Sequence, residues 1–168
     1  DGFGNVRPDS GAVYLYTFTD SVFSGGVLQS RIGDGYNGAK DINLTLNSAD
    51  RIGTSVGLAN NNLFTGAILD DGLANAITDT GAVYRFSFAD AVFSGGSLAA
   101  RIGARYSGTY DYDLRGYLST SDQFGRSLSV DGQNLVVGAS LDDGYANNTN
   151  DAGGAYFFRY TDTTYQTA

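Results

Sequence analysis

The chain of 168 residues contains no cysteine, histidine, methionine or tryptophan, and its one proline is Pro8. Because it has no cysteine, it can form neither a disulfide framework nor a metal site built from thiolates. The absence of histidine removes the commonest general base of enzymes and the commonest nitrogen ligand of metals. Both absences argue against a catalytic centre and leave oxygen atoms as the ligands for any metal.

Positive charge is also scarce, since ten Lys and Arg residues stand against 18 acidic residues and the net charge is −8. An acidic surface repels phosphate groups, so nucleic acid and anionic membranes are disfavoured as partners, whereas Ca²⁺ suits it. No apolar run approaches the roughly 20 residues of a membrane helix, so we expect no membrane insertion. The chain begins at Asp1 without an initiator Met or a signal peptide, and we expect a processed or excised piece.

Glycine and aromatic residues are abundant, with 24 Gly, 12 Tyr and 10 Phe, and this composition favours short strands joined by tight turns. Comparison of the sequence with itself reveals a repeat of about 70 residues. Residues 9–33 resemble residues 79–103 at an offset of 70, and residues 49–72 resemble residues 121–144 at an offset of 72. Residues 151–162 return to the first pattern, again 72 residues further on.

The repeat divides the chain into the end of one unit with its connection (1–48), a full unit (49–120) and an incomplete unit (121–168). We interpret the whole as a single repeat domain. The full unit holds four strand-like runs, because apolar and polar residues alternate with the period of a pleated strand. These runs are Ser55–Ala59, Leu63–Ile68, Ala82–Phe88 and Leu98–Ile102, and the alternation of Ile42, Leu44 and Leu46 hints at a fifth, outer strand.

Four antiparallel strands per unit, joined by hairpins, are typical of a β-propeller blade. A single blade cannot bury both of its faces, so blades must stack on their neighbours. The sequence therefore predicts an all-β fold of propeller blades. An open β-solenoid is the structural alternative, although its rungs are usually far shorter than about 70 residues.

Three short motifs of the last unit carry a resemblance to a known family. Phe124-Gly125-x-Ser127, then Val137-Gly138-Ala139-Ser140 and Gly154-Ala155-Tyr156-Phe157, resemble the FG-GAP repeat of integrin α-subunit-like β-propellers, and the bacterial surface and secreted versions look most similar. The resemblance implies an extracellular β-propeller, from a bacterium, with a role in adhesion or surface structure. It does not imply what the propeller binds, because function depends on sites rather than on folds.

The chain departs from the family pattern in three ways. The full unit has Ile52-Gly53 where the motif has Phe-Gly, and the proline of the second motif is replaced by Ile68 or Ser140. The hairpins between the first and second strands also lack the D-x-D-x-D-G loop that binds Ca²⁺ in many members of the family.

Ser55 lies in Gly53-Thr54-Ser55-Val56-Gly57, which matches the G-x-S-x-G pattern of a hydrolase nucleophile. A serine nucleophile of that kind needs a histidine base, and the chain has none. The equivalent segment 125–129 keeps the serine but ends in Ser129 instead of glycine. We therefore predict that no catalytic residue lies here, and that Ser55 makes a local hydrogen bond at the start of a strand.

The loops after the second strand are rich in Asp and Asn, whose oxygen atoms suit the six to eight ligands of Ca²⁺. The alternative is that these side chains bond their own backbone in Asx turns. No cofactor is required by this interpretation, and Ca²⁺ is the metal such a loop would hold. The candidate metal ligands are Asp70, Asp71, Asp79, Asp142, Asp143 and Asp151.

A second calcium pattern starts at Asp111-Tyr112-Asp113-Leu114-Arg115-Gly116, with Asp122 at the twelfth position. Arg115 stands where an oxygen ligand is required, and Asp is shorter than the bidentate Glu that usually ends such a loop, so the pattern is imperfect. The aromatic stripes of the strands are predicted to be core. Tyrosines outside the predicted strands are the candidates for an exposed ligand-binding surface, namely Tyr106, Tyr110, Tyr112 and Tyr117.

The chain holds about 2.4 repeat units, whereas known propellers have roughly four to eight blades. Either it is a fragment that continues into neighbouring repeats, or copies self-associate into a ring or a filament. Three chains would supply about 27 strands, close to a ring of seven blades. The sequence thus favours a non-catalytic extracellular module with a structural or adhesive role. A glycan-binding propeller and an accessory domain of a larger secreted hydrolase are the alternatives, with a surface protein or a glycan as the partner.

Overall fold

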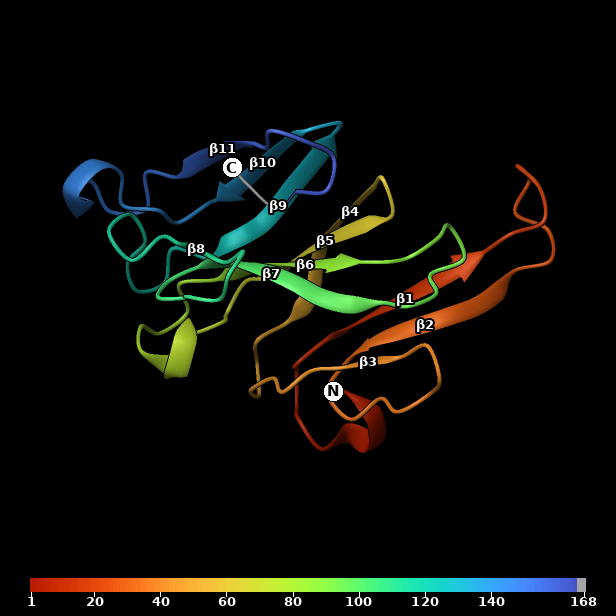
Figure 1. Ribbon diagram of the computed structural model, residues 1–168. Coiled ribbons are helices and arrows are strands. Elements are labelled where there is room, and N and C mark those ends of the chain that lie inside the picture. Colours follow the sequence, from red (N-terminus) through yellow and green to blue (C-terminus); the bar gives the residue numbers. More distant parts are fainter. Residues whose placement is uncertain (166–168) are drawn as a thin grey trace.

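The computed structural model describes residues 1–165; residues 166–168, which belong to the last predicted unit, lie outside the described part. Figure 1 shows three small sheets that follow one another along the chain, and residues 1–165 contain no α-helix. None of these residues forms a helix long and apolar enough to span a membrane. The fold is all-β and mostly antiparallel, as predicted.

Each sheet takes its strands from one stretch of the chain. The first sheet has the order β1 (Ala12–Thr17), β2 (Val27–Gly33) and β3 (Ile42–Asn43). The second has the order β4 (Ile52–Ala59), β5 (Asn62–Ala67), β6 (Ala82–Ser87), β7 (Ser97–Gly103) and β8 (Tyr112–Asp113). The third has the order β11 (Gly154–Arg159), β10 (Asn134–Ala139) and β9 (Phe124–Asp131). Three short 3-10 turns precede β1, β6 and β11: η1 (Phe3–Asn5), η2 (Leu73–Asn75) and η3 (Tyr145–Asn147).

The four main strands of the second sheet lie where the alternation predicts them, and they pair as consecutive antiparallel neighbours. The first of them starts at Ile52, three residues before the predicted Ser55. The predicted fifth strand is real but short: it spans two residues, β3 or β8, and pairs parallel to the preceding strand. Leu44 and Leu46 lie beyond β3 and are nevertheless buried.

Glycines let the backbones of neighbouring sheets approach each other closely. Gly53 and Gly125 have φ of 94° and 92°, and a Cβ atom on either would lie 2.8 or 2.7 Å from a carbonyl oxygen of the preceding sheet. Single parallel bridges also join Gly11 to Ile52 and Gly81 to Phe124. Only glycine fits this combination of positive φ and close approach. The glycine of the Phe-Gly motif is therefore explained by contact between repeats.

Two apolar clusters hold the three sheets together, and they are built from equivalent residues. The first interface joins the first and second sheets through residues such as Val13, Leu15, Tyr84 and Phe86. The second interface joins the second and third sheets. Val83, Phe124, Leu135, Phe158 and Tyr165 are among its residues. The equivalence at offsets of 70 and 72 means that one pattern of packing is used twice.

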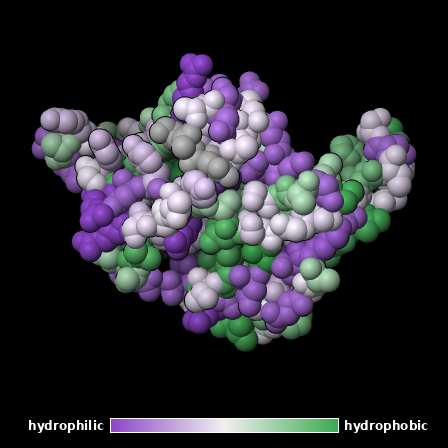
Figure 2. Space-filling view, in the orientation of Figure 1, coloured by the Kyte–Doolittle hydropathy of each residue, from purple (hydrophilic) through white to green (hydrophobic). Residues whose placement is uncertain are grey.

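The two ends of the row of sheets are not covered in the same way as the middle. Tyr84, Phe86 and Phe88 on β6 and just after it are buried, whereas the equivalent Tyr14, Tyr16 and Phe18 of the first sheet are 50%, 49% and 45% exposed. Figure 2 shows hydrophobic residues on the lobe at the right, which carries the hairpin between β1 and β2. Val136 and Phe157 are exposed on the third sheet.

Candidate functional site

Ser55 lies at a junction between two repeats. Its hydroxyl donates a hydrogen bond of 2.6 Å to the carbonyl oxygen of Gly125, 70 residues away in the third sheet. The sequence predicted a local hydrogen bond for Ser55, and this was wrong, because the bond joins two repeats. The role of Ser55 is nevertheless structural. A Cβ on Gly66 would collide with this pair of groups, so the second strand must carry glycine here.

The first acidic loop is organised around the buried carboxylate of Asp70. The hydroxyls of Tyr84 and Tyr106 donate to it at 2.6 and 2.7 Å, and the backbone N–H of Gly72 donates at 2.7 Å. Burial raises the pKa of both tyrosines well above the usual range, and the nearby Asp70 charge adds to the shift. Asp70 thus accepts three hydrogen bonds from groups of its own repeat.

The other candidate metal ligands repeat this pattern. Asp142 accepts from Gly144 N–H at 2.7 Å and from the hydroxyl of Tyr156. Asp71 and Asp143 each accept from the backbone N–H eight residues on, which belongs to Asp79 or Asp151, at 2.8 and 2.9 Å. These bonds use oxygen atoms that a cation would need.

Among residues 1–165 no group of three or more acidic side chains is close enough together to hold a metal ion. The calcium site remains a prediction, which thermal melts with Ca²⁺ and with a chelator test.

The imperfect calcium pattern at 111–122 is divided among separate contacts. Asp111 pairs with Arg101 at 2.8 Å and Asp113 with Arg115 at 2.5 Å. Asp122 is fully buried and accepts from the backbone N–H and the hydroxyl of Ser119 at 2.7 and 2.8 Å. The structure brings Asp111 to the edge of a cleft described below, but its carboxylate is neutralised by Arg101.

The four candidate tyrosines lie in different environments. Tyr106 is 4% exposed and bonded to Asp70, so the expectation that it lies on an exposed surface was wrong. Tyr112 belongs to β8 and packs edge-on against Phe158 with ring centroids 5.8 Å apart. Tyr110 and Tyr117 are 44% and 67% exposed. Only Tyr110 of these four lines a broad cleft beside β6 and β7.

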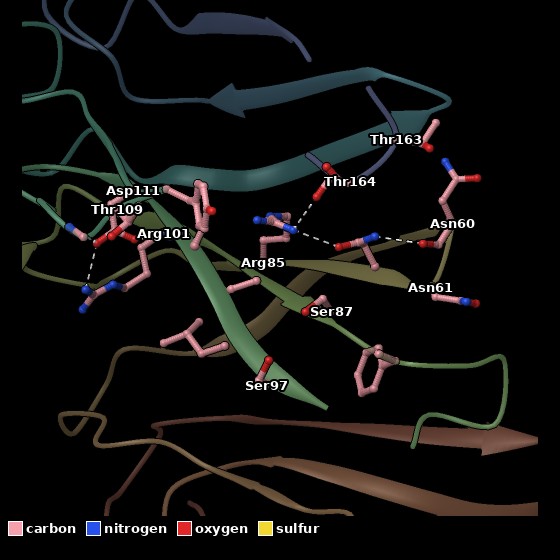
Figure 3. A pocket seen from close by; sticks show the side chains of 17 residues that line it. Asn60, Asn61, Arg85, Ser87, Ser97, Arg101, Thr109, Asp111, Thr163 and Thr164 are labelled. Atoms are coloured by element: carbon pink, nitrogen blue, oxygen red, sulfur yellow. Dashed lines mark hydrogen bonds and ion pairs between the residues drawn. The ribbon is translucent and has the colours of Figure 1, made fainter. Parts of the chain in front are cut away.

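This cleft, of about 800 Å³, opens beside β6 and β7 and reaches the segment that follows β11 (Figure 3). Asn60 and Asn61 lie at one end of it in the view, Arg101 and Asp111 at the other, and Arg85 lies between them. Amide, hydroxyl and guanidinium groups share its wall with apolar side chains such as Phe88 and Leu98. Besides these residues the lining includes Ser87, Ser97, Thr109, Tyr110, Thr163 and Thr164.

Arg85 is the unusual residue of this cleft, since it is 3% exposed and has no ion pair within residues 1–165. Its Nη1 donates to the side-chain oxygen of Asn62 at 2.9 Å and to the carbonyl oxygen of Thr164 at 3.0 Å. Its Nε is buried without a partner. Burial lowers the pKa of the guanidinium, which nevertheless stays charged in proteins. Both groups that it does bond are neutral.

Sequence reasoning missed Arg85, although a signal was present. The equivalent residues of the other units are Leu15 and Phe157, so the position calls for an apolar side chain. A charged residue that replaces apolar ones at one copy of a repeated core position marks a local departure from the packing pattern.

Two equivalent residues, Asp50 and Asp122, place carboxyl groups in the interior of the protein. Asp50 is 3% exposed, and burial raises its pKa to about 7, with a further contribution from the charges of Asp70 and Asp71. The pKa of Asp122, its equivalent, is raised for the same reason. Asp50 accepts the backbone N–H of Asn47 at 2.7 Å. These carboxyls help to close the connection before each new sheet.

Comparison with known protein families found a match in the last repeat unit. Residues 118–158 match the model of the FG-GAP repeat, so this part of the chain is an FG-GAP repeat, as the motifs around Phe124 indicated. No catalytic family was matched. A search of curated protein sequences gave no match.

Proposed function

Since residues 118–158 are an FG-GAP repeat and the preceding unit repeats the same pattern, we propose that the chain is a non-catalytic, extracellular β-propeller module with a structural or adhesive role. Its uncovered end faces take the matching faces of further repeats, which belong either to other copies or to a longer chain. The extracellular location is part of the same proposal, and it rests on the resemblance to bacterial surface and secreted propellers.

One observation carries the proposal: the same aromatic face is buried in the middle of the row and exposed at its beginning. Tyr84, Phe86 and Phe88 are 7%, 0% and 7% exposed because the first sheet covers them. The equivalent residues of the first sheet leave an aromatic surface in water, and contiguous surfaces of that kind mark interaction sites. The residues exposed on the third sheet are likewise equivalents of covered ones.

The second interface supplies a template for the contact. The ring of Phe64 meets the ring of Tyr165 with centroids 5.1 Å apart. The equivalent of Phe64 on the third sheet is Val136, and the equivalent of Tyr165 on the first sheet is Phe23; they are 39% and 73% exposed. A head-to-tail contact between these two faces generates a ring if it closes and a filament if it does not.

Light scattering on the purified chain tests the proposal. We expect a mass well above the 17.7 kDa of one chain, and Phe23→Ser should shift it toward that value. Val22→Ser is the matched control, because Val22 is as exposed as Phe23. In the first interface, however, the equivalent of Val22 is Val92, which is still 46% exposed. The equivalent of Phe23 there is Phe93, which is only 7% exposed. A folded monomer at all concentrations would contradict self-association.

Glycan binding is the second candidate function, and the position of Tyr110 favours it. This tyrosine is half-exposed on the wall of the cleft and stands beside amide and hydroxyl groups that can bond sugar hydroxyls. An aromatic ring beside hydrogen-bonding groups is a suitable surface for a sugar ring. Tyr110→Ala should then weaken saccharide binding measured by a glycan array, without changing the thermal midpoint by more than a few degrees.

A further inference from the structure

The cleft exists because one of the two interfaces departs from the shared packing pattern. In the first interface, Lys40 closes the equivalent place: its Nζ donates to Gln29 at 2.8 Å and to the carbonyl oxygen of Val92 at 2.9 Å. The residues equivalent to these three are Tyr110, Ala99 and Thr164. Among residues 1–165 no hydrogen bond joins Tyr110 to Thr164, and the shorter Ala99 leaves space between them.

Arg85 stands at the inner wall of that space, in place of Leu15 of the first interface. Burial of a charge without an opposite charge is costly, and an apolar residue is the economical choice at this position. The fold therefore does not explain the arginine. A ligand that brings a negative charge into the cleft would.

The free groups of Arg85 indicate the kind of charge. Nη1 is occupied by Asn62 and Thr164, whereas no hydrogen bond within residues 1–165 uses the Nε side of the guanidinium. That edge can form two parallel bonds with a planar carboxylate. The charge of Asp162 acts on Arg85, but its carboxylate accepts from Thr164 N–H and hydroxyl at 2.8 and 2.6 Å and forms no ion pair with the arginine within residues 1–165.

We propose that this cleft binds a carboxylate-bearing sugar, such as a uronic acid residue of a glycan, with its carboxylate on Arg85 and its ring beside Tyr110. The hydroxyls of the sugar meet Thr109, which adjoins Tyr110 at the same end of the cleft. The proposal specifies the ligand of the second candidate function and rests on it, but it does not depend on the stacking of copies. Arg101 adds no net charge, because it pairs with Asp111.

Ligand-observed saturation-transfer NMR on the intact chain tests this, because it tolerates assemblies of any size. The probes are methyl glucuronide and methyl glucoside, which differ only in the carboxylate. We expect methyl glucuronide to bind at least about tenfold more tightly, as a charge-assisted bidentate contact would provide. Acetate is the third probe and separates a sugar site from a simple carboxylate site.

Two variants of equal charge complete the test. Arg85→Leu introduces the residue that the first interface uses, so it should fold, and it should abolish the preference for the glucuronide. Arg159→Leu removes an exposed arginine of β11 and should leave the preference unchanged. Equal binding of both glycosides would refute the acidic ligand while keeping glycan binding. Acetate that binds as tightly as methyl glucuronide would refute the sugar. No binding of any probe would overturn both.

Discussion

The two interfaces between sheets are built from equivalent residues, yet Lys40 closes the first interface at the place where the second holds a cleft of about 800 Å³. In both, a valine of the preceding sheet, Val13 or Val83, is buried with aromatic residues of the following sheet. They differ at Leu15, Gln29 and Lys40, which become Arg85, Ala99 and Tyr110. The comparison teaches that packing between repeats needs most of the shared positions but tolerates substitution at a few of them.

The largest effect on stability is expected when the first interface receives an arginine at the position where the second interface has Arg85. Leu15→Arg should lower the free energy of unfolding by about 4 kcal/mol, because Leu15 is 7% exposed and no anion stands ready to pair. Chemical denaturation measures this change. Leu15→Met keeps the volume and should cost less than about 1.5 kcal/mol. If the two variants were equally stable, the first interface would not be a packed apolar joint.

A pH effect should come next, and it sharpens the comparison of equivalent acids. Asp50 has a raised pKa of about 7, so the folded state holds its proton more tightly than the unfolded state. Its stabilising effect is fully present below about pH 4 and is lost as the pH rises through 7. Asp122 acts in the same direction. Between pH 5 and 8 the free energy of unfolding should fall by on the order of 2 kcal/mol.

Asp50→Asn serves as the control for the pH effect, since an amide oxygen can still accept the N–H of Asn47. The variant should show a flatter dependence between pH 5 and 8 when urea denaturation is measured at each pH. The window must stay above about pH 4, because the bond to Arg31 lowers the pKa of Asp41, which loses its stabilising contribution at lower pH. Identical slopes for wild type and variant would exclude Asp50 as the source.

The open interface should respond in the opposite sense to the closed one. Arg85→Leu should raise the free energy of unfolding by about 1.5 kcal/mol, because an apolar side chain replaces a buried unpaired charge. Arg159→Leu, on the exposed side of β11, should change it by less than about 0.5 kcal/mol. Thermal denaturation without ligand compares the two. A large loss of stability in Arg85→Leu would mean that the arginine serves the fold.

The smallest change concerns the hydrogen bond between the second and third sheets. Ser55→Ala removes the donor to the carbonyl oxygen of Gly125 and should cost about 1 kcal/mol. Thr54→Ala is a neighbouring control, since its hydroxyl donates to the carbonyl oxygen of Arg51 within the same turn. Hydrogen exchange at residues 125–127 should rise only in the Ser55 variant. Equal effects would indicate that Ser55 acts locally.

The strands could be predicted from the sequence because alternation and repetition coincide at residues such as Tyr84 and Phe86. The shortness of β8 could not be predicted. Its parallel pairing with β7 depends on how the connection after β7 brings the chain back to the edge of the sheet. Tyr106 was expected at the surface because it lies outside the alternating runs of the strands, although the repeat matches it to Tyr36, which is also buried. Arg85 differs from both of its equivalents, but the cleft beside it depends on a neighbouring sheet.

The exposed end faces are the part of the proposed function that a single experiment can test most directly. The chain has no cysteine, so engineered thiols report one contact each. Val22→Cys and Val136→Cys variants, which keep Phe23, should be joined by a bismaleimide cross-linker into a linked pair of chains when they are mixed, because the equivalent of Val22 adjoins Tyr165, whose ring lies 5.1 Å from that of Phe64, the equivalent of Val136. Each variant alone should cross-link far less. Cross-linking that is no greater in the mixture than in either variant alone would contradict head-to-tail stacking of the repeats.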